Sequence, residues 1–247
     1  MRRLRGLLFA DPAILLATIF FGSLSILFSF FDRTGSVQIR VARMWARTLL
    51  AVSGISVNVE GLERIDPNGS YVFIANHASY MDTPVALAHV PVQFRFLAKR
   101  GLFQIPFLGQ HLSQAGHIPV PREDPRASVK TMQVAAETIQ KKRISLLIFP
   151  EGGRSHDGHL RAFKEGGAYI AIRAGVPCVP LVLIGTRKVL PYGAGVVLSG
   201  TVKLLVLEPI ATHEMTLRDR GILTDRLRQL IAEHVGEPVI AESRLKS

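Results

Sequence analysis

From Ile55 onward, the pattern of apolar and polar positions changes its period repeatedly along the chain. Short continuous apolar runs are typical of buried strands, and longer segments with an apolar residue every three or four positions are typical of helices. The pattern predicts strands at 55–60, 71–75, 94–98, 116–120, 144–149, 178–184, 195–199 and 202–207, and helices at 83–89, 104–113, 127–142, 163–174 and 222–235. This alternation predicts an α/β fold with a mostly parallel sheet flanked by helices.

The first apolar segment is longer and carries no charge from residue 13 to residue 31. As a helix it would extend about 28 Å, close to the thickness of a bilayer hydrocarbon core. Arg2, Arg3 and Arg5 precede it, and the positive-inside tendency places this end in the cytoplasm. A cleaved signal peptide has a similar pattern, but this run is long and no Ala-x-Ala-like site follows it. We therefore expect a retained segment that crosses the bilayer or lies within one leaflet.

A second helix is predicted at 37–52, where Arg40, Arg43 and Arg47 share one face and Trp45 lies elsewhere around the helix. An interfacial helix would place its arginines on lipid phosphates and its indole at the headgroup level. An ordinary helix packed on the domain, with its arginines in water, fits the pattern equally well. Both interpretations stay open.

Residues 32–35 are typical of a turn between these two helices. We therefore expect residues 1–53 to form a two-helix membrane-associating appendage. No repeat, low-complexity tract or linker interrupts the alternating pattern that follows, so we expect residues 54–247 to form one further domain.

Composition narrows the classes of partner. The chain is 48% hydrophobic and carries a formal net charge of +11, which indicates contact with lipid and with a polyanion. A nucleic-acid binder would interleave basic residues with exposed aromatics, whereas most of the 13 Phe lie in the N-terminal run and in strand-like segments. The single cysteine, Cys178, excludes a disulfide framework and a cysteine metal site, and we expect it to be a small buried residue.

Residues suited to catalysis follow the predicted strand 71–75 directly. His77 and Asp82 would diverge by about 140° on one continuous helix, so a pair requires a turn between them. Asp82, with Pro84 in the first turn, is typical of a helix start. Asp82 could then orient the imidazole of His77, which would take a proton from a substrate hydroxyl. The alternative is a capping aspartate beside a surface histidine.

A second polar segment follows the continuous apolar run 144–149. Gly152 and Gly153 would let the backbone approach a ligand closely, and Arg154 could grip phosphate with its two-pronged guanidinium. In the alternative, Glu151 and Arg154 merely pair across a turn. Neither segment supplies an obvious Ser or Cys nucleophile beside the histidine, which favours direct base catalysis over a covalent intermediate.

These two segments resemble sequence blocks of the glycerolipid acyltransferase family, the 1-acyl-sn-glycerol-3-phosphate acyltransferases. The family pattern Asn-His-x-x-x-x-Asp matches Asn76, His77 and Asp82. The pattern Phe-Pro-Glu-Gly-Thr-Arg-Ser matches residues 149–155, except that Gly153 replaces the threonine.

Two further blocks strengthen the resemblance. A glycine that leads through apolar residues to Asp-Arg corresponds to 116–122, with Pro121 where aspartate is usual. An apolar stretch around a proline corresponds to 179–181. The blocks come in the family's order and cover roughly residues 55–210, so residues 54–247 resemble a glycerolipid acyltransferase domain.

The resemblance implies transfer of an acyl group from a thioester to the sn-2 hydroxyl of lysophosphatidic acid, which gives phosphatidic acid for phospholipid biosynthesis. His77 would be the general base and Asp82 its orienting partner. The substrate-binding residues implied for the acceptor are Lys99, Arg122, Glu151, Gly152 and Arg154.

The resemblance also implies that no cofactor is needed, because acyl-CoA or acyl-carrier protein enters as a substrate. The implied partners are this donor, a lysophospholipid acceptor and an anionic bilayer surface, at the inner, cytoplasmic membrane with the domain facing the cytoplasm. His156 and His159 only superficially resemble a metal cluster, and we expect a polar loop without metal.

Three other activities stay open. The departures at Gly153 and Pro121 leave room for another acceptor such as a lyso-ornithine lipid. A hydrolase would use His77 and Asp82 to activate water on a lipid ester. A non-catalytic lipid-binding protein would keep its function without His77.

Overall fold

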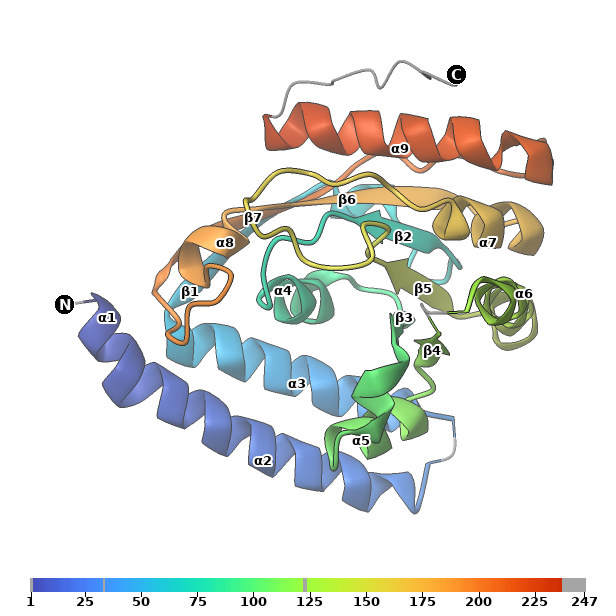
Figure 1. Ribbon diagram of the computed structural model, residues 1–247. Helices are drawn as coiled ribbons and strands as arrows, with labels where there is room; N and C mark the ends of the chain where they lie inside the picture. Colours follow the sequence, from blue (N-terminus) through green and yellow to red (C-terminus); the bar gives the residue numbers. More distant parts are fainter. Residues whose placement is uncertain (1, 33, 122–123, 237–247) are drawn as a thin grey trace.

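The computed structural model describes residues 2–32, 34–121 and 124–236, and in this part of the chain a seven-stranded sheet forms the middle of three layers (Figure 1). The strands lie in the order β1-β7-β6-β2-β5-β3-β4. Their bounds are β1 Ile55–Glu60, β2 Val72–Ala75, β3 Phe94–Lys99, β4 Ile118–Val120, β5 Ser145–Ile148, β6 Cys178–Ile184 and β7 Gly200–Val206.

The centre of the sheet is parallel. Strand β2 lies between β6 and β5 and is parallel to both, and β3 and β4 continue in the same direction. Strand β7 pairs antiparallel with β6 and parallel with β1, so the sheet is mixed at one side. The prediction of a mostly parallel sheet flanked by helices is confirmed. Parallel pairing also brings the carboxyl ends of β2, β5 and β6 to one edge, where ligand sites of such sheets form.

Both faces of the sheet are covered by helices, because successive side chains of a strand point to opposite faces. Phe73 and Leu147 pack with α3 and α4 on one face, while Val72 and Leu146 pack with α6, α7 and α9 on the other. The helices are α1 Arg2–Arg5, α2 Asp11–Ser29, α3 Ser36–Ser53, α4 Asp82–His89, α5 Leu108–Gln114, α6 Pro125–Lys142, α7 Gly166–Ala174, α8 Thr186–Val189 and α9 Arg220–Val235.

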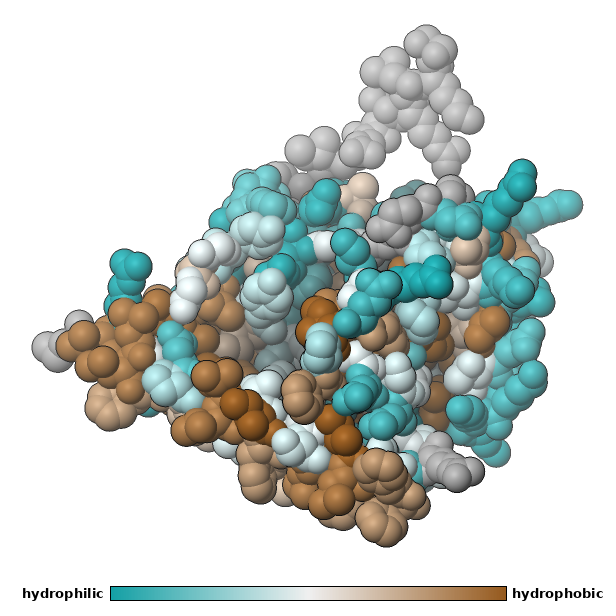
Figure 2. All heavy atoms as spheres, turned by 60° about the horizontal axis from the view of Figure 1, so that its bottom comes forward, coloured by the Kyte–Doolittle hydropathy of each residue, from teal (hydrophilic) through white to brown (hydrophobic). Residues whose placement is uncertain are grey.

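The N-terminal segment is one apolar helical rod, in which a π-helical turn at Gly6–Ala10 joins α1 to α2. By length and composition Arg2–Ser29 is long and apolar enough to cross a membrane. It lies alongside α3 and also packs on α5 (Figure 1). The side turned away from the domain shows a band of hydrophobic side chains (Figure 2). Exposed members are Leu4, Leu7, Leu8, Phe9, Leu15, Leu16, Ile19, Phe20, Leu27, Phe28, Phe30 and Phe31.

Polar contacts fasten this rod to the domain. The indole N–H of Trp45 in α3 donates to Thr18 at 3.1 Å. The hydroxyl of Ser25, which is only 1% exposed, lies 2.7 Å from Nδ1 of His111 in α5. These bonds join α2 to α3 and to α5, so α2 lies along the surface of these two helices.

Helix α3 packs in the core on one face of the sheet through residues such as Ala46 and Leu49. Of the two interpretations of this helix, the structure supports the one packed on the domain, with a correction to its arginines. Arg43 donates to the carbonyl oxygens of residues 90–92, and Arg47 donates to that of Ala88, at the end of α4. Arg43 and Arg47 therefore tie α3 to the end of α4 and to the segment that follows it. The division of the chain at residues 53 and 54 stays a prediction.

Several element predictions were wrong in detail. The segment 195–199 is not a strand, because Leu198 N–H donates to Val189 and Val197 N–H donates to the Asp11 carboxylate. The helix predicted at 104–113 begins only at Leu108, as α5, because a proline at position 106 separates it from a 3₁₀ turn at Arg100–Gln104. Helix α8 was not predicted.

Candidate active site

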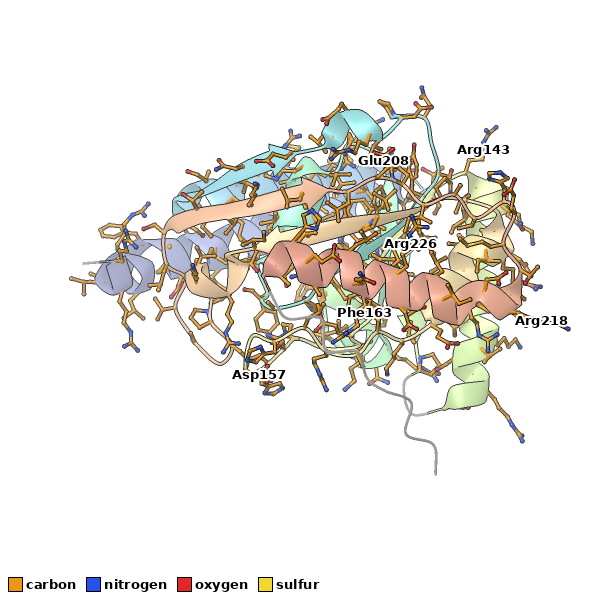
Figure 3. All side chains as sticks on the ribbon, turned by 90° about the horizontal axis from the view of Figure 1, so that it is seen from above. Arg143, Asp157, Phe163, Glu208, Arg218 and Arg226 are labelled. Atoms are coloured by element: carbon orange, nitrogen blue, oxygen red, sulfur yellow. The ribbon has the colours of Figure 1, made fainter. Side chains whose placement is uncertain are left out.

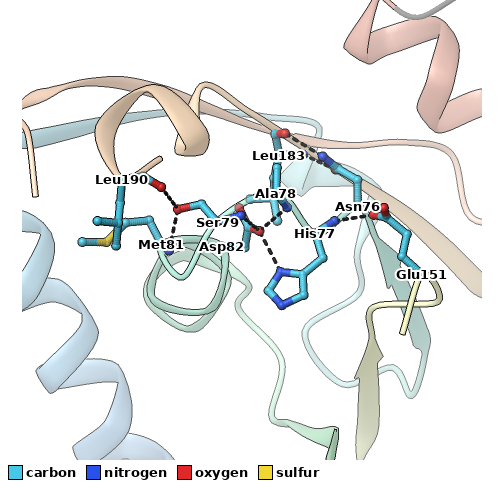
Figure 4. A network of polar contacts seen from close by, with 9 residues as sticks. All are labelled: Asn76, His77, Ala78, Ser79, Met81, Asp82, Glu151, Leu183 and Leu190. Atoms are coloured by element: carbon cyan, nitrogen blue, oxygen red, sulfur yellow. Dashed lines mark hydrogen bonds and ion pairs between the residues drawn. The ribbon is translucent and has the colours of Figure 1, made fainter. Parts of the chain in front are cut away.

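His77 and Asp82 lie at the carboxyl end of β2, where the chain turns into α4. His77 Nδ1 is 2.8 Å from Asp82 Oδ2 (Figure 4). The same Oδ2 accepts the backbone N–H groups of Ala78 and Ser79, each at 2.8 Å. Asp82 is fully buried and its acceptor bonds go to the turn before the helix. The structure thus forms the predicted pair and not the capping aspartate of the alternative.

This geometry sets the tautomer of His77. A carboxylate oxygen can only accept, so Nδ1 carries the proton that it donates to Asp82. Nε2 is then left with a lone pair. The His77 ring also stacks on Phe149 with a centroid distance of 4.0 Å, and Phe149 stacks on Phe96 at 6.2 Å. The side chain of His77 is 17% exposed, so the imidazole is held firmly and still reaches solvent.

Neighbouring side chains fix the turn that carries His77. The amide of Asn76 makes two bonds to the backbone of Leu183 in β6, donating to its carbonyl at 2.9 Å and accepting its N–H at 2.8 Å. The Ser79 hydroxyl donates to the carbonyl of Leu190 and accepts the N–H of Met81 (Figure 4). All these groups are buried, so the turn is braced against β6 and the segment after α8.

Glu151 links the second polar segment to the first. One carboxylate oxygen accepts the backbone N–H of His77 at 2.6 Å, and the other accepts that of Arg161 at 3.0 Å. The backbone of Ser155 adds a bond to the His77 carbonyl. Burial raises the pKa of Glu151 to about 7 despite these N–H donors. Each oxygen of Glu151 thus accepts one backbone N–H, and the carboxylate links the loop after β5 to residues 76–82, here called the histidine turn.

Arg154 does not pair with Glu151 across the turn. Its guanidinium lies over the ring of Tyr80, 3.3 Å from the centroid, and 5.1 Å from that of Tyr192. Stacking on an aromatic face leaves the edges of the guanidinium free to bind a carboxylate or phosphate. The Arg154 side chain therefore packs on Tyr80, three residues after His77 in the chain.

The remaining predicted residues are spread around this edge. Gly152 has a φ of +75°, and a Cβ there would press on the side chain of Lys164, so the tight turn depends on glycine. Lys99 is exposed at the end of β3. Arg122 lies outside the described residues.

Sequence reasoning missed the segment that completes a pocket of about 350 Å³ next to His77 and Glu151. Thr186, Arg187 and Lys188 line it, directly after the end of β6. The available signal was a Gly-Thr-Arg-Lys run after a buried strand, the same arrangement that drew attention to the other two loops.

Other nucleophile and metal candidates are weak. Cys178 is buried, and burial raises its pKa to about 12, which keeps the thiol protonated. Within the described residues, no three His, Cys, Asp or Glu side chains are grouped to hold a metal ion. The ring of His156 packs on Tyr192 at 3.9 Å between centroids.

A family model described as Acyltransferase matches residues 56–184. A chloroplastic 1-acyl-sn-glycerol-3-phosphate acyltransferase of Arabidopsis thaliana is 34% identical over 195 residues, which cover 78% of this chain and 52% of that protein. The human 1-acyl-sn-glycerol-3-phosphate acyltransferase alpha is 29% identical over 77% of this chain and 68% of that protein. The chain spans about half the length of the first plant relatives that it matches.

Among solved structures, the 1-acyl-sn-glycerophosphate (LPA) acyltransferase of Thermotoga maritima superimposes with a TM-score of 0.79 at 25% identity, and the match covers 100% of both chains. The family model covers more than half of this chain and includes the turn after β2 and the loop after β5. The chain therefore belongs to the acyltransferase family.

Proposed function

We propose that this protein is a membrane-associated 1-acylglycerol-3-phosphate O-acyltransferase, which moves an acyl group from a thioester to the sn-2 hydroxyl of lysophosphatidic acid and gives phosphatidic acid. The observation that carries the proposal is the buried bond between His77 Nδ1 and Asp82, which leaves Nε2 as a proton acceptor. The names of the Arabidopsis, human and Thermotoga relatives support this choice of reaction.

The reaction needs one proton acceptor and one stabilised oxyanion. Nε2 of His77 takes the proton of the acceptor hydroxyl, and the oxygen of that hydroxyl attacks the thioester carbonyl. Asp82 stabilises the imidazolium that forms. The tetrahedral intermediate collapses, the C–S bond breaks, and the imidazolium returns the proton to the departing thiolate. A base of this kind contributes about 10² to 10⁴ in rate, so positioning and oxyanion donors supply the rest.

Direct transfer fits the side chains near His77. The Ser79 hydroxyl is buried and donates to the Leu190 carbonyl, so its proton faces away from the histidine. The thiol of Cys178 lies in the core with a raised pKa. Both groups are poor nucleophiles here, which favours attack by the substrate hydroxyl itself.

For the acceptor, we propose that Arg154 contacts its phosphate, with Lys99 and Arg122 as further contacts. Gly152 lets the backbone turn closely under the substrate. Glu151 was predicted to bind substrate, and its two backbone bonds support a positioning role instead.

We further propose that the N-terminal helix lies in one leaflet of the cytoplasmic membrane. Its inner side is bonded to α3 and α5, and its outer side carries the exposed apolar band. Such a helix buries its apolar face among lipid chains while the domain stays in water. Arg2, Arg3 and Arg5 then favour the cytoplasmic leaflet, where acyl-CoA and acyl-carrier protein occur.

The test uses the full chain purified in detergent, with acyl-CoA and lysophosphatidic acid. Free thiol and phosphatidic acid are measured for the wild type, His77→Ala and the control His213→Ala, which changes an exposed histidine. We expect acceptor-dependent thiol release that only His77→Ala abolishes.

Other outcomes contradict parts of the proposal. Thiol release without an acceptor would identify a hydrolase. Activity with lyso-ornithine lipid but not with lysophosphatidic acid would assign a different acceptor. The assay includes this lipid because Gly153 and Pro121 depart from the family pattern. Full activity of His77→Ala would remove the histidine from the mechanism.

A further inference from the structure

The pocket beside His77 lies between the loop 155–160 and the segment 184–191, and has a volume of about 350 Å³. Figure 3 places Asp157 of this loop near the C-terminal end of α9, while Arg218 lies at the opposite end of that helix. The pocket therefore lies near the C-terminal end of α9, next to the histidine turn.

Two polar atoms of this pocket's lining residues are buried without a hydrogen-bond partner in the part of the chain that the structure describes. Thr186 is 1% exposed and its hydroxyl makes no hydrogen bond, and Nη1 of Arg187 is likewise buried and unbonded. An unpaired buried group costs about 1–3 kcal/mol. Such groups call for an explanation, and a bound ligand that supplies acceptor atoms is one.

Contacts with the loop 155–160 hold the Arg187 guanidinium in place. Its Nη2 donates to the carbonyl of His156 at 2.8 Å. A Cβ at Gly158, which has a φ of +97°, would collide with Nη1 of Arg187. The glycine thus permits close contact between the loop and the guanidinium, and one prong of the fork is anchored while the other is unused.

The charge of the pocket favours an anion. Arg187 and Lys188 both line it. Among the described residues, neither nearby carboxylate forms an ion pair with Arg187: Glu151 accepts two backbone N–H groups, and Oδ1 of Asp157 accepts the Ser155 hydroxyl and a backbone N–H. The positive charge of Arg187 is thus left for a ligand with oxygen acceptors.

We propose that this pocket is a phosphate-binding site, in which the Thr186 hydroxyl, Nη1 of Arg187 and the Lys188 ammonium hold a phosphate ester of a substrate. The choice of substrate rests on the proposed function, since both the acceptor and the phosphopantetheine end of the thioester donor carry phosphate. The site is separate from Arg154, which lies over the Tyr80 ring. It therefore adds a second anion contact beside the histidine turn.

Binding is tested first with inorganic phosphate and the full chain in detergent, by thermal unfolding. The variants are Thr186→Val, which removes only an unpaired hydroxyl, and Arg187→Lys. The control is Arg218→Lys, which changes an exposed arginine in the turn before α9, at the opposite end of that helix. We expect phosphate to raise the melting temperature of the wild type and the control, and to raise it less in both pocket variants. Without phosphate, Thr186→Val should unfold at the wild-type temperature or above. Equal stabilisation of all four proteins, or of none, overturns the proposal.

Kinetics then identify which phosphate is bound. Loss of one charge-assisted bond should raise a KM about tenfold with little change in kcat. If the phosphate belongs to the acceptor, the variants raise KM for lysophosphatidic acid but not for monoacylglycerol, which lacks phosphate. If it belongs to the donor, they raise KM for acyl-CoA but not for an acyl thioester of N-acetylcysteamine. An unchanged KM for both phosphate-bearing substrates contradicts the proposal. A wild type without acyltransferase activity would refute the proposed function alone, because the phosphate experiment still decides the pocket.

Discussion

The two loops at the carboxyl edge of the sheet differ in how they are held. The turn after β2 is buried and braced by side chains: Asn76 bonds the backbone of β6, and Asp82 collects the imidazole and two backbone N–H groups. In the loop after β5, residues 156–159 are exposed, and Glu151 is its main polar anchor to the histidine turn. Proton transfer requires fixed geometry, whereas a headgroup can be bound by a loop that adjusts.

The comparison predicts that the largest effect comes from Asp82→Asn. Asparagine can keep its amide oxygen where Oδ2 accepts the three hydrogen bonds, but it has no negative charge to stabilise the imidazolium that forms on His77. We expect kcat to fall about 10³-fold with little change in KM. Steady-state kinetics beside Asp225→Asn, an exposed aspartate, measure this. A loss confined to KM would mean that Asp82 binds substrate.

Asn76→Leu tests the brace itself. Leucine would leave both the N–H and the carbonyl of Leu183 unpaired in a buried position, which costs about 2–4 kcal/mol. The control is Gln140→Leu, because its amide bonds a carbonyl at the exposed surface, and we expect less than about 0.5 kcal/mol there. Denaturant unfolding measures both free energies. Equal destabilisation would show that the Asn76 bonds are not special.

Most of the fold could be predicted because continuous apolar runs mark buried parallel strands. The central strands β2, β5 and β6 were found within a residue or two. The errors arose where tertiary contacts decide: 195–199 has strand-like composition, yet its backbone bonds go to α8 and to Asp11. Strand β7 is antiparallel to β6 and parallel to β1. The spacing of apolar residues along the chain does not reveal such pairing between segments that are far apart in sequence.

One contact of the candidate site, the pair formed by His77 and Asp82, could be expected from sequence spacing. The spacing of His77 and Asp82 required a turn, and the turn is there. The family resemblance implied that Glu151 binds substrate, and this stays a prediction; the structure adds that its carboxylate accepts backbone N–H groups of residues distant in sequence, which the sequence pattern does not reveal. The run that contains Thr186 and Arg187 follows a buried strand and could have been noticed in the sequence, but their unpaired atoms are visible only once the surrounding chain is in place.

Glu151→Gln examines the link between the loops. The pKa of Glu151 is raised from 4.5 to about 7 by burial, so folding favours its protonated form. The protonated carboxyl stabilises the folded protein fully below about pH 4.5. As the pH rises through 7 this stabilisation is lost, which lowers the free energy of unfolding by about 3 kcal/mol. We expect the free energy of unfolding of the wild type to fall relative to Glu151→Gln across this range. A constant difference between the two proteins would show that the carboxyl titrates normally.

The same variant should lower kcat by about tenfold or more, because the glutamine NH₂ group must face the N–H of either His77 or Arg161 and shifts the histidine turn. The pH dependence and the loss of kcat are measured independently. A stability change without a kinetic one would mean that the turn keeps its geometry without the carboxylate.

The smallest effect is expected in the adjustable loop. Arg154→Met removes a guanidinium that stacks on Tyr80 and makes no buried contact with the histidine turn. We expect KM for lysophosphatidic acid to rise about tenfold while kcat and the melting temperature stay near wild type. Arg173→Met, at an exposed position on α7, is the control, and Arg154→Lys should behave like Arg154→Met because an ammonium lacks the planar fork. A large fall in kcat would contradict the division of labour between the loops, since Arg154 would then act on the transition state and not on acceptor binding.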